Sequence, residues 1–124
     1  MTRTNLTIDH VSAGLTVLAG KLRAAGAVPI KDNKRREWHL EVDRNKVPEM
    51  WMIEFETKKG RGELRCDLGD KETEVSIYDE DFGGATDTAF MIPREDPNLI
   101  AKDARLIRKI ASYDYSVPGD DESY

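Results

Sequence analysis

The chain contains a single cysteine, Cys66, among its 124 residues. One cysteine excludes an intramolecular disulfide, and no cysteines and histidines have the spacing of a zinc site. The sequence also lacks the run of about 20 apolar residues that crosses a bilayer, and residues 1–8 do not read as a secretory signal peptide. These absences favour a cytoplasmic protein that folds without disulfides, metals or cofactors.

Length and composition predict one folded domain. The chain is 39% hydrophobic and 35% charged, with a formal net charge of -5. Its hydrophobic residues are too frequent and too regularly spaced for a disordered chain, and the length provides for one core rather than two. We expect a single domain over residues 1–113. Residues 114–124 contain proline, glycine and four acids but no base, which predicts an acidic, flexible tail.

The order of periodic segments predicts an α+β fold with an antiparallel sheet. Helical spacing of apolar residues begins after Thr7 or Asp9 and ends at Gly26, and residues 28–34 read as a loop. Apolar and polar residues then alternate with a period of two, which is typical of strands. The expected elements are a four-stranded meander at about 37–43, 50–56, 63–68 and 75–77, a short edge strand at 88–92, and a helix from Asp96 or Pro97 to about residue 110. Both helices are expected to cover the apolar sheet face.

A single register places apolar residues opposite one another in every hairpin. It pairs Phe55 with Leu64, Cys66 with Val75, and Trp38 with Trp51. The same register sets Glu56 beside Glu63 and Asp67 beside Glu74. Like charges directly opposite each other are mildly destabilising, so folding alone gives no reason to prefer them.

Carboxylates dominate the polar side of this alternation, and two methionines lie among them. Because the helices are expected on the other side, this face is expected to be open and to bind a basic protein surface; the alternative is a merely solvated face. The expected partner-binding residues are Glu37, Glu41, Met50, Met52, Glu54, Glu56, Glu63, Asp67 and Glu74. Charge analogy with bacterial immunity proteins and phage anti-defence proteins suggests a noncatalytic inhibitor of a nucleic-acid-handling protein.

Basic residues cluster in two loops that the strand order places at one end of the sheet. This cluster indicates an alternative function, direct binding of nucleic acid. The anion-binding residues would be Lys31, Lys34, Arg35, Arg36, Lys58, Lys59 and Arg61. The acids at 79–81, which end the fourth strand, would neutralise part of the cluster.

A further alternative is a magnesium-dependent nuclease. Glu56, Thr57 and Lys58 form a Glu-x-Lys triplet after an apolar strand, which resembles the metal-binding strand of PD-(D/E)xK nucleases. The resemblance implies acids that hold magnesium and a lysine that helps to activate water. The Pro-Asp pair that precedes the triplet in that family is absent, and Glu37 and Glu54 would be the nearest additional ligands.

Histidine and cysteine positions do not indicate catalysis. His10 and His39 lie beside no candidate nucleophile, and Cys66 is expected to face the core, where a thiol is unreactive packing. The sequence therefore predicts a binding protein rather than an enzyme.

Overall fold

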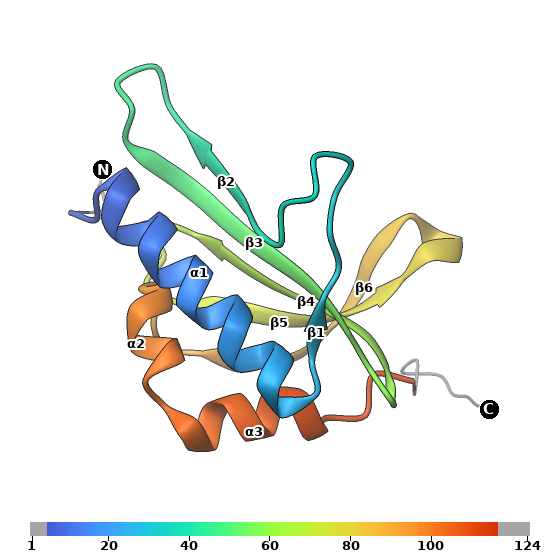
Figure 1. Cartoon of the computed structure of the whole chain (residues 1–124). Coiled ribbons are helices and arrows are strands. Elements are labelled where there is room, and N and C mark those ends of the chain that lie inside the picture. The colour runs from blue at the N-terminus through green and yellow to red at the C-terminus, as the bar shows by residue number, and fades with distance from the viewer. Residues whose placement is uncertain (1–4, 117–124) are drawn as a thin grey trace.

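A computed structural model describes residues 5–116 and confirms an α+β fold with an antiparallel sheet (Figure 1). The elements are α1 (Ile8–Ala25), β1 (Val28–Pro29), β2 (His39–Val42), β3 (Pro48–Thr57), β4 (Gly60–Asp67), β5 (Thr73–Asp79), the 3-10 helix η1 (Glu80–Phe82), β6 (Gly84–Ile92), α2 (Pro97–Ala101) and α3 (Ala104–Ser112). The sheet order is β1-β3-β4-β5-β6, and β2 also pairs with β3. The helices pack on one face of the sheet, and no helix within residues 5–116 covers the other face, which we call the open face (Figure 1).

Helix α1 begins and ends where the sequence predicts. The Thr7 hydroxyl accepts a hydrogen bond from the backbone N–H of His10 at 3.1 Å, which caps the first turn. Gly26 has a φ of 106° and ends the helix by donating its N–H to carbonyls of the last turn. The buried stripe of the helix is Val11, Leu15, Leu18 and Leu22, and it packs against the apolar side of β3, β4 and β5.

The hairpins differ from the predicted register by two residues. Phe55 lies opposite Gly62, Leu64 opposite Val75, and Leu40 opposite Trp51, so the three predicted pairs are wrong. In the hairpin between β3 and β4, Thr57 pairs directly with Gly60, which leaves a two-residue turn where a turn over 58–61 was predicted. Because the shift is even, every residue of these strands keeps its predicted face.

Three elements were not predicted as they occur. Val28 and Pro29 form a short edge strand opposite Glu56 and Phe55, where a loop was expected. Strand β6 spans Gly84–Ile92 and is longer than the expected edge strand. The C-terminal helix is divided into α2 and α3 because the side chain of Asp103 accepts a hydrogen bond from the N–H of Leu106 at 3.1 Å and so caps a new helix.

The predicted tail boundary at residue 114 is wrong. Tyr115 is only 3% exposed, and its ring packs edge-on against Phe55 at a centroid distance of 5.3 Å. Its hydroxyl donates to the carbonyl of Ile110 at 2.8 Å. The folded domain therefore includes residues 114–116, and the rest of the predicted tail, 117–124, lies outside the described residues.

Candidate binding surface

The open face is formed by the alternate residues of β3, β4 and β5 that point away from the helices. Strand pairing places Glu54 opposite Glu63, and Arg65 opposite both Met52 and Glu74. The predicted acid pairs are therefore wrong, since Glu63 faces Glu54 instead of Glu56 and Glu74 faces a base instead of Asp67. One row of the face retains two carboxylates directly opposite each other.

Glu63 is the most unusual of these acids. It is only 8% exposed although it lies on the sheet face that carries no helix. Its carboxylate makes no hydrogen bond and no ion pair with any residue of 5–116. Burial, followed by the charges of Glu54 and Glu74, raises the pKa of Glu63 above its ordinary value of 4.5, although Arg65 opposes this. The folded protein thus holds a largely buried glutamate side chain whose carboxylate lies among other carboxylates.

Arg61, predicted in the anion-binding cluster, belongs to the open face instead. Its guanidinium lies 4.4 Å from the ring centroid of Tyr78, pairs with Glu80 and lies 3.8 Å from a carboxylate oxygen of Glu54. The Nε of Arg61 is buried and has no hydrogen-bond partner within the described part of the chain. Arg61 therefore neutralises one side of Glu54, and its guanidinium is already paired on the open face.

Arg65 is the second base of the open face. It donates a long hydrogen bond of 3.3 Å to Asp67. This bond, together with the charges of Asp67, Glu63 and Glu41, raises the pKa of Arg65. Nearly half of its side chain remains exposed, so Arg65 only partly compensates the acids around it.

The methionines of the open face are not arranged as predicted. Met50, opposite Asp67 and Glu41, is only 7% exposed, so it is not part of an accessible apolar patch. Met52 is half-buried. Met91 of β6, which the sequence analysis did not consider, lies opposite Glu74 and is 45% exposed. The accessible thioethers are therefore those of Met52 and Met91.

The remaining predicted acids separate into two groups. Glu41 and Glu56 are exposed, and Glu41 lies 3.1 Å from a ring nitrogen of His39. Glu37 lies at the margin of the open face: it lines a hollow with Met52 and Glu54, and its carboxylate pairs with Arg23 of α1. The alternation that assigned Glu37 to this face does not reach it, because β2 begins only at His39.

The two basic loops do not converge as predicted. β1 and β2 pair with different parts of the same edge of β3, so the chain leaves the sheet after Ile30, whose N–H donates to the backbone carbonyl of Glu54 at 2.8 Å. The loop carrying Lys31, Lys34, Arg35 and Arg36 therefore projects from the side of the sheet. Lys58 and Lys59 form the turn at the far end of β3, well separated from that loop in Figure 1.

The structure does not assemble the metal site that the nuclease resemblance implies. Glu56 lies opposite Arg61 rather than another acid, and Lys58 is exposed in the turn. Within residues 5–116, no group of three or more His, Cys, Asp or Glu side chains is placed to hold a metal ion.

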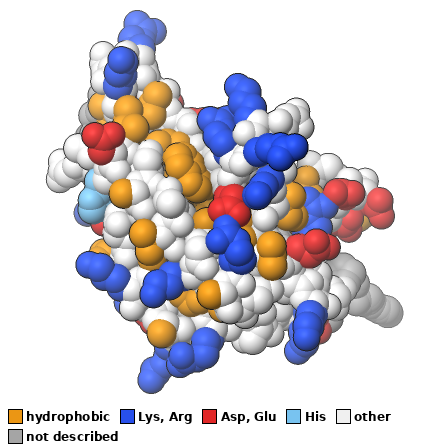
Figure 2. Space-filling view, in the orientation of Figure 1, with side chains coloured by type: hydrophobic (Ala, Val, Ile, Leu, Met, Phe, Trp, Pro, Cys, Tyr) orange, Lys and Arg blue, Asp and Glu red, His pale blue; other side chains and the backbone are white. Residues whose placement is uncertain are grey.

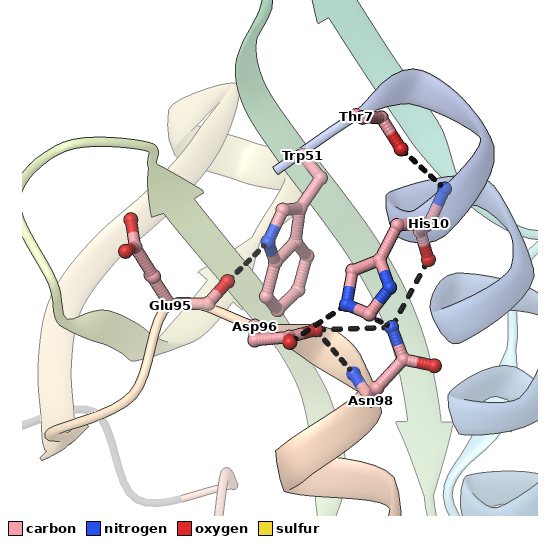
Figure 3. A network of polar contacts seen from close by, with 6 residues as sticks. All are labelled: Thr7, His10, Trp51, Glu95, Asp96 and Asn98. Atoms are coloured by element: carbon pink, nitrogen blue, oxygen red, sulfur yellow. Dashed lines mark hydrogen bonds and ion pairs between the residues drawn. The ribbon is translucent and has the colours of Figure 1, made fainter. Parts of the chain in front are cut away.

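His10 belongs to a polar network that joins α1 to α2 (Figure 3). Its Nε2 lies 2.8 Å from Oδ2 of Asp96, and the amide of Asn98 donates to the His10 carbonyl at 3.0 Å. Asn98 also donates to Asp96 through both its side chain and its backbone. In the described residues no hydroxyl or thiol donates to the imidazole, so the network fastens two helices rather than forming a nucleophile–base pair.

The network predicts a loss of stability at acid pH. Burial alone would raise the pKa of Asp96. The hydrogen bonds from His10 and Asn98 outweigh this effect and hold the pKa below its ordinary value of 3.8. The stability from this carboxylate is therefore present above pH 3.8 and is lost as the pH falls through the folded pKa. Asp96→Ala should cost about 1 to 2 kcal/mol in urea unfolding at neutral pH and less at about pH 2.5.

Asp87, an exposed acid of β6, provides the control for this measurement. Asp87→Ala should change the free energy of unfolding little at either pH. An Asp96→Ala cost that is the same at both pH values would show that the charge of Asp96 has no part in the network.

Cys66 faces the core, as predicted. Its thiol donates to the carbonyl of Glu72 at 3.3 Å, and burial raises its pKa to about 12. The thiol is therefore protonated at physiological pH.

None of the helices within residues 5–116 has the length and apolar character needed to cross a membrane. Comparison with protein-family models, with curated proteins and with solved structures found no match.

Proposed function

We propose that this chain is a noncatalytic binding protein whose open face receives a basic side chain of a protein partner. The observation that supports this is Glu63, an acid only 8% exposed that has Glu54 and Glu74 as neighbours and forms no ion pair with any residue of 5–116. An opposed pair of like charges destabilises a sheet by tenths of a kcal/mol up to about 1. A lysine or arginine from a partner would convert this unfavourable arrangement into a favourable one.

The surroundings of Glu63 suit the entry of such a side chain. In the neighbouring row Met52 and Met91 lie on either side of the Arg65–Glu74 pair, and His39 lies beyond Met52. Flexible thioethers adapt to the apolar stem of a lysine or arginine, whose charged end would then lie among the carboxylates. The face therefore combines a buried charge with accessible apolar contacts.

Exposed acids around this centre would assist the encounter. Glu41, Glu56 and Asp67 are all exposed, and a rim of one charge attracts a surface of the opposite charge and raises the association rate. Basic surfaces are typical of proteins that handle nucleic acid. We therefore propose an inhibitor or regulator of such a protein, acting in the cytoplasm.

Glu63→Lys tests the proposal directly. The new ammonium group would lie where the partner's cation is proposed to bind, so the free protein should be slightly more stable, by up to about 1 kcal/mol. Partner binding should be lost, because the site is filled and now repels a base. The milder Glu63→Gln should weaken binding by about 2 kcal/mol, or about thirtyfold. Affinity purification from the native host, quantified by mass spectrometry, measures both.

Asp87→Lys provides the matched control, because it changes the net charge by the same amount at an exposed position of β6. The proposal requires a partner that the wild type and Asp87→Lys capture and that Glu63→Lys does not. Equal capture by all three proteins, or no specific capture by the wild type, would refute it. Unfolding curves of the variants would distinguish a loss of partner binding from a loss of the folded structure.

A further inference from the structure

A basic hollow lies on the helical side of the sheet, beside the loop between β1 and β2. Its volume is about 460 Å³, and it is lined by Thr16, Arg23, Lys31, Arg35, Arg36, Glu37 and Trp38. Figure 2 shows Lys and Arg side chains gathered over this loop, with an acidic side chain among them. The hollow differs from the predicted anion-binding set because it includes Arg23 and Trp38 and does not include the 58–61 turn.

The loop is held in one conformation by Asp32. The backbone N–H groups of Lys34 and Arg36 donate to Asp32 Oδ1 at 2.8 and 2.9 Å. The backbone N–H of Asp32 donates in turn to the Arg36 carbonyl at 3.0 Å. These bonds, above all the one from Arg36, lower the pKa of Asp32 and keep it charged. A loop fixed in this way presents its basic side chains in a defined geometry.

Two cations of the hollow are free to bind an anion. Arg23 pairs with Glu37, and Arg36 pairs with Asp32. Lys31 and Arg35 form no ion pair with any residue of 5–116. Four bases and one acid line the hollow, which gives it a formal charge of +3.

Trp38 gives the hollow an aromatic wall. The ring is half-buried and packs against the hydrophobic core, yet it also lines the hollow. The predicted register sets Trp38 beside Trp51 on the apolar face of the sheet, but only part of the Trp38 ring is buried there. An indole held by the core on one side and open to a basic hollow on the other is a typical stacking surface for a nucleobase.

From this geometry we propose that the hollow binds a nucleotide, either free or within single-stranded nucleic acid. Lys31 and Arg35 hold the phosphate, and Arg23 contributes once the phosphate competes with Glu37 for it. The base stacks on the exposed part of Trp38. Trp38, Glu37 and Arg36 also line a smaller hollow with Met52 and Glu54 at the margin of the open face. Glu63 lies outside both hollows, so the variants that test this site and those that test the proposed function change different residues.

Tryptophan fluorescence provides a direct test. The chain has two tryptophans, and Trp51 is fully buried, so quenching by a stacked base reports on Trp38. We expect saturable quenching by AMP if the site takes a free nucleotide, or only by a short oligothymidylate if it takes single-stranded nucleic acid. Either result supports the proposal. Trp38→Leu should abolish the quenching and weaken binding about tenfold.

Two further variants separate binding from folding. Arg35 has a φ of 62°, a left-handed conformation that asparagine adopts more readily. Arg35→Asn should therefore preserve or improve stability, yet weaken binding about fivefold. Glu37→Gln removes the acid from the hollow and releases Arg23, so it should tighten binding about threefold. A purely structural role for these residues would not give opposite effects.

Lys58→Ala/Lys59→Ala is the control, because these bases lie outside the hollow. The control should bind like the wild type. The proposal would be overturned by absence of quenching with both AMP and the oligothymidylate. It would also be overturned by double-stranded DNA that binds as tightly as the single strand without quenching, since that result assigns the affinity to surface charge in general.

Discussion

Tyr115→Ala should lower the free energy of unfolding by about 4 kcal/mol. The side chain is 3% exposed and its ring fills the space between Phe55, Gly62 and Tyr113. Its removal leaves a cavity lined by aromatic rings and leaves the Ile110 carbonyl without the hydroxyl that donates to it. Chemical denaturation of the full chain, followed by circular dichroism, measures the loss.

Two variants determine which part of Tyr115 matters. Tyr115→Phe retains the ring and loses only the hydrogen bond to Ile110, so it should cost about 1 kcal/mol. Arg108→Ala changes an exposed residue of α3 and should leave stability nearly unchanged. A Tyr115→Ala protein as stable as the wild type would mean that the residues after α3 do not complete the core.

Tyr115 also shows why sequence reasoning placed the domain boundary too early. Its immediate neighbours, Asp114 and Ser116, are polar, and the alternation of Tyr113, Tyr115 and Val117 is too short to predict a buried strand. The contacts that bury it come from Phe55 and Gly62, which lie 60 and 53 residues earlier in the chain. Only the folded sheet brings these residues together.

The faces of the sheet could be predicted, but the pairing of strands could not. Period-two alternation assigns each residue to a face, and an even shift in register leaves that assignment unchanged. The register itself depends on turn geometry. Here Gly60, with a φ of 111°, allows a two-residue turn after Thr57, and the hydrophobic pattern does not report this.

The same limit applies to the candidate sites. The sequence identified Glu63 as an exposed acid, whereas the structure shows that it is buried. It assigned Arg61 to a nucleic-acid site and Glu37 to the open face, whereas Arg61 pairs with Glu80 and Glu37 pairs with Arg23 at the margin of that face. Ion pairs between distant segments are made by tertiary structure. The period-two alternation therefore predicted which residues lie on the open face. It could not show which charged side chains of that face have no partner of opposite charge.

Charge is separated between the two sides of the sheet, and this connects the two proposals. The acids of β3, β4 and β5 lie on the open face, while the bases of the β1–β2 loop and Arg23 surround the hollow on the helical side. A cationic partner centred on Glu63 and an anionic ligand in the hollow would thus bind to adjoining regions of opposite charge, which meet at Glu37 and Glu54. Net charge alone, at -5, would have hidden the basic site.

Gly62→Val should destabilise the protein by about 2 to 3 kcal/mol, although strand propensity predicts the opposite sign. A Cβ at this position would lie 2.6 Å from Cζ of Phe55 and 2.8 Å from Cε1 of Tyr115. These rings are packed against each other in the core and cannot both move away without opening a cavity.

Gly20→Ala in α1 is the control, since a Cβ there meets nothing within 4 Å, and it should stabilise the helix by about 0.5 to 1 kcal/mol. Adding Phe55→Leu to Gly62→Val should recover part of the loss if the clash is with that ring. Unfolding curves that place Gly62→Val at or above wild-type stability would instead show that propensity, not packing, determines the residue here.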